Sequence, residues 1–246
     1  MRKIILFIAL AASFSNFFPR PGIAQDFHRS YTIPAGGQIR IGNISGNVKL
    51  IGYGGATIEV AAYKLGSDRN LVEVEDNSAG DRIDLRAHYL QSHSGNASLN
   101  FEVRVPQSME YNYERLSSVS GNIEVSHVTG RLRAESVSGN IDVLDVSGLV
   151  SAGSVSGNVN VDITRLQGNG DMKFSSVSGN VSVKAPASLD ANIGMSSLSG
   201  SLKTDFPVDV QERPYGPGRS ARGRLGSGTR SLRITSVSGQ VSLIRK

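Results

Sequence analysis

Apolar residues recur in a fixed arrangement around a repeated Ser-Gly pair along most of the chain. Counted from the glycine, they stand seven, five and two positions before it and two and four positions after it. Seven copies carry this arrangement, and their glycines are Gly46, Gly121, Gly139, Gly157, Gly179, Gly200 and Gly239. Glu114 and Thr204 occupy apolar positions of two copies and are the departures. The regularity predicts a repeating structure.

Each half of a copy alternates apolar and polar residues with a period of two, which is typical of a β-strand with one buried face. The spacing is three between the positions five and two before the glycine, so the alternation changes phase at the Ser-Val-Ser-Gly step and requires a corner there. We therefore predict a strand, a corner and a second strand in each copy, with five aliphatic side chains in the core and the glycines as structural corners. A second turn signal, ending at Gly130 and Gly148, predicts a rung with two similar sides.

A single rung cannot be stable alone, because five aliphatic side chains do not offset the entropy lost by about 18 ordered residues. Stacking gives each strand neighbours on both sides and encloses the aliphatic rows. The sequence thus predicts an all-β protein with a β-solenoid or closely related stacked-strand repeat fold, with a β-sandwich-like or β-prism arrangement as the alternative. Stacking in register would place four corner residues in a hydrogen-bonded ladder: Asn122, Asn140, Asn158 and Asn180.

The first residues have the order of a secretory signal peptide. Arg2 and Lys3 precede the apolar run 4–12, and small residues stand at 22 and 24. Nine apolar residues are too few to span a bilayer. We expect residues 1–24 to be a signal peptide and the mature chain, without a transmembrane segment, to be exported to the periplasm, the cell surface or the extracellular space. The lack of cysteine excludes a lipoprotein and fits an envelope protein without disulfides.

We predict that residues 25–246 form one adhesin-like β-repeat domain. Residues 25–110 hold less regular strands, over 57–62, 82–88 and 99–106, and residues 111–205 hold the regular rungs. Residues 206–230, rich in Pro, Gly and Arg, are predicted to form a mobile basic insertion before a final strand pair over 231–246.

Composition adds two limits. The chain has 35 serines, 28 glycines and neither cysteine nor tryptophan, which excludes a disulfide-rich mini-protein and a cysteine-ligated zinc domain. The net charge of +5 is unevenly placed, because residues 213–246 hold eight basic residues and no acid, whereas residues 25–212 hold 15 basic and 21 acidic residues. The body of the protein is therefore acidic and its end is basic.

The basic end supplies the candidate binding residues Arg213, Arg219, Arg222, Arg224 and Arg230. Arginine offers planar, multidentate donors to phosphate, acidic glycan or lipopolysaccharide. A solvated loop is the alternative interpretation. Nucleic acid is not expected as a partner, because the protein is exported and the basic run lacks interleaved aromatic residues.

Catalytic signals are weak. No metalloprotease, nucleophile-elbow or nucleotide-binding motif is present, and His88 and His93 would not share a strand face. A polysaccharide lyase or glycosidase would need paired carboxylates, for which Asp142, Asp145 and Asp162 are the candidates. The loop 75–81 has oxygen ligands suited to calcium but not the spacing of an EF-hand. We expect no catalytic residue, no metal site and no cofactor.

Three features together resemble a known family: the export signal, the segment Gly-x-Ile-x-Ile-x-Asn-Ile-Ser-Gly-Asn-Val over 37–48, and the tandem Ser-Val-Ser-Gly-Asn rungs that follow Val103-Arg104-Val105-Pro106. They are similar to the bacterial "putative adhesin" family of β-strand-repeat domains of unknown function. The resemblance covers nearly all of the mature chain. It implies an envelope or extracellular location and a non-catalytic binding or structural role, and it carries over no catalytic residue.

The expected partner is an unknown envelope protein or a surface glycan. Two other functions stay open: a periplasmic protein-interaction partner in envelope-stress signalling, and a solenoid enzyme that acts on polysaccharide.

Overall fold

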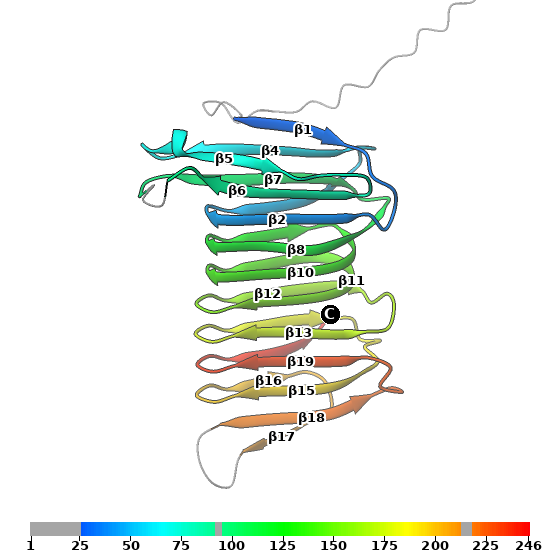
Figure 1. Ribbon diagram of the computed structural model, residues 1–246. Helices are drawn as coiled ribbons and strands as arrows, with labels where there is room; N and C mark the ends of the chain where they lie inside the picture. Colours follow the sequence, from blue (N-terminus) through cyan, green and yellow to red (C-terminus); the bar gives the residue numbers. More distant parts are fainter. Residues whose placement is uncertain (1–25, 92–94, 213–217) are drawn as a thin grey trace, which may run out of the picture.

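The structure is a computed structural model that describes residues 26–91, 95–212 and 218–246. The described residues form twenty strands, which lie across a long axis one above another (Figure 1). This confirms the predicted stacked β-solenoid. The strands are β1 (Phe27–Tyr31), β2 (Gln38–Ser45), β3 (Val48–Tyr53), β4 (Ile58–Leu65), β5 (Val72–Asp76), β6 (Arg82–Tyr89), β7 (Ser98–Pro106), β8 (Glu110–Ser120), β9 (Ile123–Ser126), β10 (Thr129–Ser138), β11 (Ile141–Ser154), β12 (Val159–Arg165), β13 (Asp171–Ser176), β14 (Val181–Ala185), β15 (Ala191–Ser197), β16 (Leu202–Thr204), β17 (Asp209–Glu212), β18 (Arg219–Leu225), β19 (Ser231–Ser236) and β20 (Val241–Arg245), with a short 3-10 helix at Arg69–Leu71.

The strands form two faces that enclose the core. Face A runs along the stack as β5, β6, β2, β8, β10, the second half of β11, β13, β19, β15, β18 and β17. Face B runs as β1, β4, β7, β3, β9, the first half of β11, β12, β14, β20 and β16. Strand β11 passes from face B to face A, so each rung has the two sides that the second turn signal predicted.

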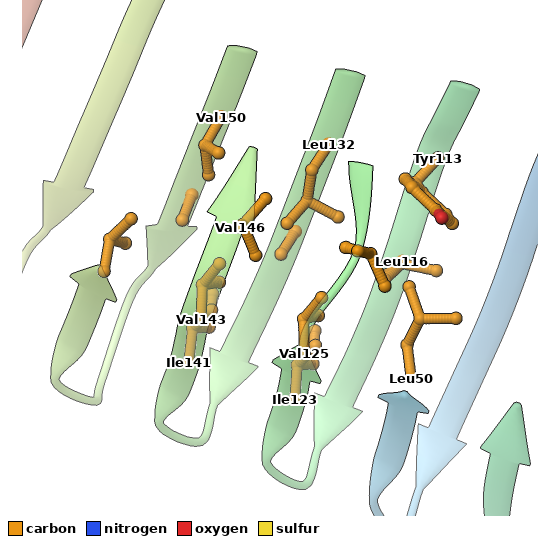
Figure 2. Packing of buried hydrophobic residues seen from close by; sticks show 14 of the residues in the cluster. Leu50, Tyr113, Leu116, Ile123, Val125, Leu132, Ile141, Val143, Val146 and Val150 are labelled. Atoms are coloured by element: carbon orange, nitrogen blue, oxygen red, sulfur yellow. The ribbon is translucent and has the colours of Figure 1, made fainter. Parts of the chain in front are cut away.

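Alternating residues of both faces point into one continuous core. Figure 2 shows Leu132 and Val150 of face A and Ile123 and Ile141 of face B between the two layers of strands. All four are at most 1% exposed. The positions seven and five before the glycine and two and four after it therefore supply the core, as the period of two requires, except at Glu114, Leu202 and Thr204, which are only partly buried.

The apolar residue two positions before each glycine is not in the core, so the prediction of five buried side chains was wrong at this position. These residues are 42–49% exposed. The inward alternation of the first strand continues to the residue three positions before the glycine, which is buried and is a serine in every copy but the first, where it is Asn43. The next residue consequently points to solvent.

The corner is held by a serine and by the absence of a side chain at glycine. The Ser136 hydroxyl donates to the Gly121 carbonyl at 3.1 Å, and Ser154 donates to the Gly139 carbonyl at 2.9 Å. A Cβ atom on Gly157 would lie 2.1 Å from the Gly139 carbonyl oxygen. Only glycine lets neighbouring corners stack at the spacing of paired strands.

The predicted asparagine ladder is confirmed. The backbone N–H of Asn140 donates to the side-chain oxygen of Asn122 at 2.9 Å, and Asn158 and Asn180 continue the series with the same distance. Before Asn122 the series includes Asn100 and Asn47, since the Asn47 N–H donates to Asn100 at 2.8 Å and the Asn122 N–H donates to Asn47 at 2.9 Å. Gln240 follows Asn180. Each bond joins a side chain to the backbone of the next rung, so the ladder fixes the register.

The order of rungs in space differs from their order in the chain. Strands β2 and β3 lie between β6/β7 and β8/β9, and the last pair, β19 and β20, lies between β13/β14 and β15/β16. The segment 206–230, predicted as a basic insertion, contains β17 and β18 in its described part, and these strands pair antiparallel at the end of face A. Antiparallel strands also end the stack at β1, β4 and β5.

A β-bulge explains why Glu114 stands at an apolar position of the repeat. Leu132 pairs with Tyr113 and Ala134 pairs with Leu116, so Glu114 and Arg115 together oppose one residue of β10. The extra residue shifts the alternation. Tyr113 enters the core, and Glu114 faces outward.

Candidate functional site

The outer surface of face A carries a row of cations at one register position, six residues before the corner glycines. We call this set the basic row: Arg40, Arg115, Arg133, Lys173 and Arg233. Neighbouring strands are about 4.8 Å apart, so the row crosses the face perpendicular to the strands. The row is interrupted once, on β11, where Ser151 occupies the same position.

The short Ser151 side chain leaves a groove between the longer side chains of the neighbouring strands. The outward residues of β11 are Leu149, Ser151 and Gly153, and they form its floor. Arg131 and Arg133 of β10 line one side of the groove, and Asp171 and Lys173 of β13 line the other; the volume is about 570 Å³. Small residues on one strand between long charged residues on its neighbours produce this hollow.

A second groove of about 610 Å³ adjoins the first and shares Glu114, Arg133 and Glu135 with it. Here the cations are paired. Arg40 binds both oxygens of Glu114, at 2.7 and 2.6 Å, and Arg86 binds Asp84 at 3.0 Å. The hydrogen bond from Arg40 holds the pKa of Glu114 below its usual range. This part of face A is therefore internally neutralised.

The charges beside the first groove are only partly neutralised. Glu135 binds Arg133 at 2.6 Å and Arg115 at 3.3 Å, so one carboxylate serves two cations. Within the described ranges, no carboxylate lies at ion-pair distance from Arg131, Lys173 or Arg233. Lys173 and Arg233 are direct register partners on neighbouring strands. Like charges in this arrangement are destabilising unless an anion lies between them.

The five arginines predicted as a site divide into three groups. Arg213 lies outside the described residues. Arg222 and Arg224 point outward from β18, beside Gly194 and Asn192 of β15. Arg222 is also the register partner of Asp209 on β17, and Arg224 donates to the Ser227 carbonyl at 3.0 Å. Arg230 donates to the Gly168 and Asp190 carbonyls and holds loops together, and Arg219 begins β18. A binding role for these arginines stays a prediction.

Sequence reasoning missed the centre of the surface. The cations at six positions before five of the glycines were a usable signal, because the period of two places that position on the outward side. Ser151 and Gly153 were visible as small residues at positions where the neighbouring copies carry charged or larger ones. To recognise these residues as the floor of a groove, the order of the strands along the stack must be known.

The carboxylates considered for an enzyme lie elsewhere. Asp142 accepts a hydrogen bond from Asn160 at 2.8 Å on face B, and Asp162 binds Lys246 at 2.7 Å. Asp145, at the second corner, accepts a hydrogen bond from Thr164, which lowers the pKa of Asp145. A general acid needs a raised pKa, so this carboxylate is tuned in the opposite direction.

The acidic loop considered for calcium is engaged in protein contacts. Asp76 accepts hydrogen bonds from the Tyr31 hydroxyl at 2.7 Å and from the Ser78 N–H at 3.0 Å, and it pairs with Arg29. Across the part of the chain that the structure describes, no three His, Asp or Glu side chains are grouped to hold a metal ion. Nor does that part contain a helix long and apolar enough to cross a membrane.

A family model described as Toastrack DUF4097 matches residues 22–244. The chain belongs to the Toastrack DUF4097 family. The match spans both faces of the stack, the groove over β11 and the end strands. A Toastrack domain is thus the whole folded body described above. A search of curated proteins finds no match to this Toastrack chain.

Two solved structures are similar to it in fold. A crystal structure of a "putative cell adhesion protein" from Clostridium sporogenes ATCC 15579 has 13% sequence identity and a TM-score of 0.48, and the similarity covers 89% of this chain and 99% of that one. A "putative adhesin" from Bacteroides fragilis NCTC 9343 has 15% identity and a TM-score of 0.42, with 89% and 96% covered.

Proposed function

We propose that this Toastrack protein is an exported, non-catalytic binding module of the bacterial cell envelope whose ligand-binding surface is the groove over β11 and the adjoining cations of face A. One observation carries the proposal: Lys173 and Arg233 lie side by side with no carboxylate of the described residues at ion-pair distance, next to an open groove lined by Arg131. Unneutralised cations on neighbouring strands cost stability. A bound anion removes that cost.

The chemistry of the surface favours an extended acidic glycan. Arginine and lysine bind carboxylate, sulfate or phosphate groups through charge-assisted hydrogen bonds. Ser151 and Ser175, which also line the groove, offer hydroxyls for neutral sugar groups. The cations are spread along the stack, so a polymer with repeated negative charges can contact several of them.

The export of the protein is part of this proposal. It is supported by the order of residues 1–24, which lie outside the described part of the chain. Adhesion to a surface glycan is the leading role, and contact with an envelope protein in stress signalling is the alternative for the same surface.

A binding assay tests the proposal. Fluorescently labelled polygalacturonate should bind the protein with an affinity that falls as salt rises, whereas neutral dextran should not bind. Replacing Arg131 and Lys173 by alanine should weaken binding about tenfold or more. Equal binding of the acidic and the neutral polymer, or an unaffected double variant, would contradict the proposed site. Release of reducing sugars from the polymer would favour the enzyme instead.

A further inference from the structure

The residues two positions before the corner glycines form a second surface, at the edge where the two faces meet. In spatial order these are Ile44, Val119, Val137, Val155, Val177, Val237 and Leu198, and we call them the aliphatic ladder. Each is 42–49% exposed. Of the ten large hydrophobic residues exposed in the described ranges, seven belong to this ladder. Their exposure follows from one register position.

The ladder is continuous. The N–H of Ser156 donates to the Val137 carbonyl at 2.7 Å, and the N–H of Ser178 donates to the Val155 carbonyl at 2.8 Å. The strand pairing thus extends through the corner and holds successive side chains about 4.8 Å apart. Seven rungs give a straight apolar edge roughly 30 Å long.

The residues on either side of the ladder are uncharged. In all seven copies, the five positions from three before the glycine to one after it hold only Ser, Asn, Gln, Gly and aliphatic residues. Charged residues are depleted at the centres of protein interfaces, because their desolvation is costly. A charge-free strip in an otherwise charged surface therefore has the composition of an interface.

We propose that the aliphatic ladder is a self-association surface on which a second copy of this chain packs, ladder against ladder. A second copy presents side chains with the same spacing over the same length, so aliphatic residues of the two edges interdigitate along all seven rungs. Two copies related by a two-fold axis use the same patch, and neither brings a charge into the contact.

The exposed area of the ladder and its neighbouring serines is close to that of a standard protein–protein interface. The seven aliphatic residues expose on the order of 500 Å², and the exposed serines beside them add on the order of 250 Å², close to the roughly 800 Å² per partner of a standard interface. Contiguous apolar patches of this size often mark an interaction site. The groove over β11 lies on the outer surface of face A, so both copies keep it open.

Val155 is the fourth of the seven residues and lies at the centre of the ladder. It meets Val155 of the second copy whether the two stacks run in the same or in opposite directions. The chain has no cysteine, so a disulfide in a Val155→Cys variant can form only between the introduced cysteines of two copies. Leu144 supplies the matched control, because it is 52% exposed but lies outside the ladder.

Sedimentation analysis and cross-linking test the proposal. The purified protein should dimerise with rising concentration, and Val155→Glu should weaken dimerisation at least tenfold, while Leu144→Glu should not. Val155→Cys should form a disulfide-linked dimer on oxidation, and Leu144→Cys should not. Circular dichroism shows whether each variant is folded, and the paired substitutions Val137→Ser and Val177→Ser replace Val155→Glu if that variant unfolds.

Three results would overturn the proposal. One is a protein that stays monomeric up to concentrations on the order of 1 mM. A second is a dimer that the folded ladder variants leave unchanged. The third is a monomer that binds phosphatidylglycerol-containing vesicles through Val155, because the ladder would then be a lipid contact.

Discussion

The outer surfaces of faces A and B are built from the same repeat but differ in how their charges are arranged. On face A, Lys173 pairs in register with Arg233, and neither has a carboxylate partner in the described part of the chain. On face B, Lys49 lies 4.0 Å from Glu124, and Asp162 is the register partner of Lys184. Face B thus places opposite charges next to each other at these positions, whereas on face A two cations, Lys173 and Arg233, lie side by side next to a groove that basic and acidic residues line together.

The difference between the two faces shows which positions of the repeat are constrained by folding. Inward positions are aliphatic on both faces, because every rung must bury them against the next. Outward positions are free of that demand, so their side chains can vary. Charges of one sign placed side by side on face A are unfavourable for folding alone, and we attribute them to binding.

The largest effect is expected at the corner that joins the two faces. Gly157→Ala would place a Cβ atom 2.1 Å from the Gly139 carbonyl oxygen, so the two faces could no longer stack in register. We expect a loss of about 3 kcal/mol or more in the free energy of unfolding. Gly194→Ala is the control, because no atom lies within 4 Å of its added Cβ. Chemical denaturation measures both, and equal losses would refute the steric role of the corner.

A smaller effect on stability is expected at Tyr113, whose hydroxyl is buried inside the stack. Tyr113 is 0% exposed, and its hydroxyl is a buried polar atom without a hydrogen-bond partner among the described residues. Burial raises the pKa of Tyr113, so the group stays neutral. Tyr113→Phe should raise the free energy of unfolding by about 1 kcal/mol, since an unpaired buried hydroxyl is removed. A destabilised variant in thermal denaturation would show that the hydroxyl has a partner.

The ion pairs of face A should make the stability of the fold depend on pH. The pKa of Glu114 is lowered by the hydrogen bond from Arg40, so this pair stabilises the fold above the unfolded pKa of about 4.3 and loses its effect as pH falls through the folded value. Melting temperatures measured from pH 7 to pH 2 should therefore fall less steeply in Glu114→Gln than in the native protein. Identical profiles for the variant and the native protein would contradict this.

The smallest effect separates stability from binding. Arg233→Ser should raise the free energy of unfolding by a few tenths of a kcal/mol, because it removes the like charge opposite Lys173. The same variant should bind polygalacturonate less tightly. Lys184→Ser on face B should be neutral or slightly destabilising, because Lys184 pairs in register with Asp162. A destabilised Arg233→Ser would mean that this cation serves the fold.

Sequence reasoning predicted the architecture because stacking imposes a strict rule on inward positions. The corner glycines and the asparagine ladder followed from the same rule. It failed for the aliphatic ladder, since hydrophobicity suggested burial at a position that the alternation directs outward. It also failed for the groove over β11, because the order of rungs along the stack depends on pairing between distant segments such as β13 and β19.

Face A is the proposed site of anion binding, and a matched charge reversal tests this directly. Lys173→Glu with Arg233→Glu changes face A, and Lys184→Glu with Lys203→Glu makes the same change in net charge on face B. Calorimetric titration with polygalacturonate should show an affinity loss of at least tenfold for the first pair and less than twofold for the second. Equal losses for both pairs would mean that net charge alone governs binding and would contradict a site on face A.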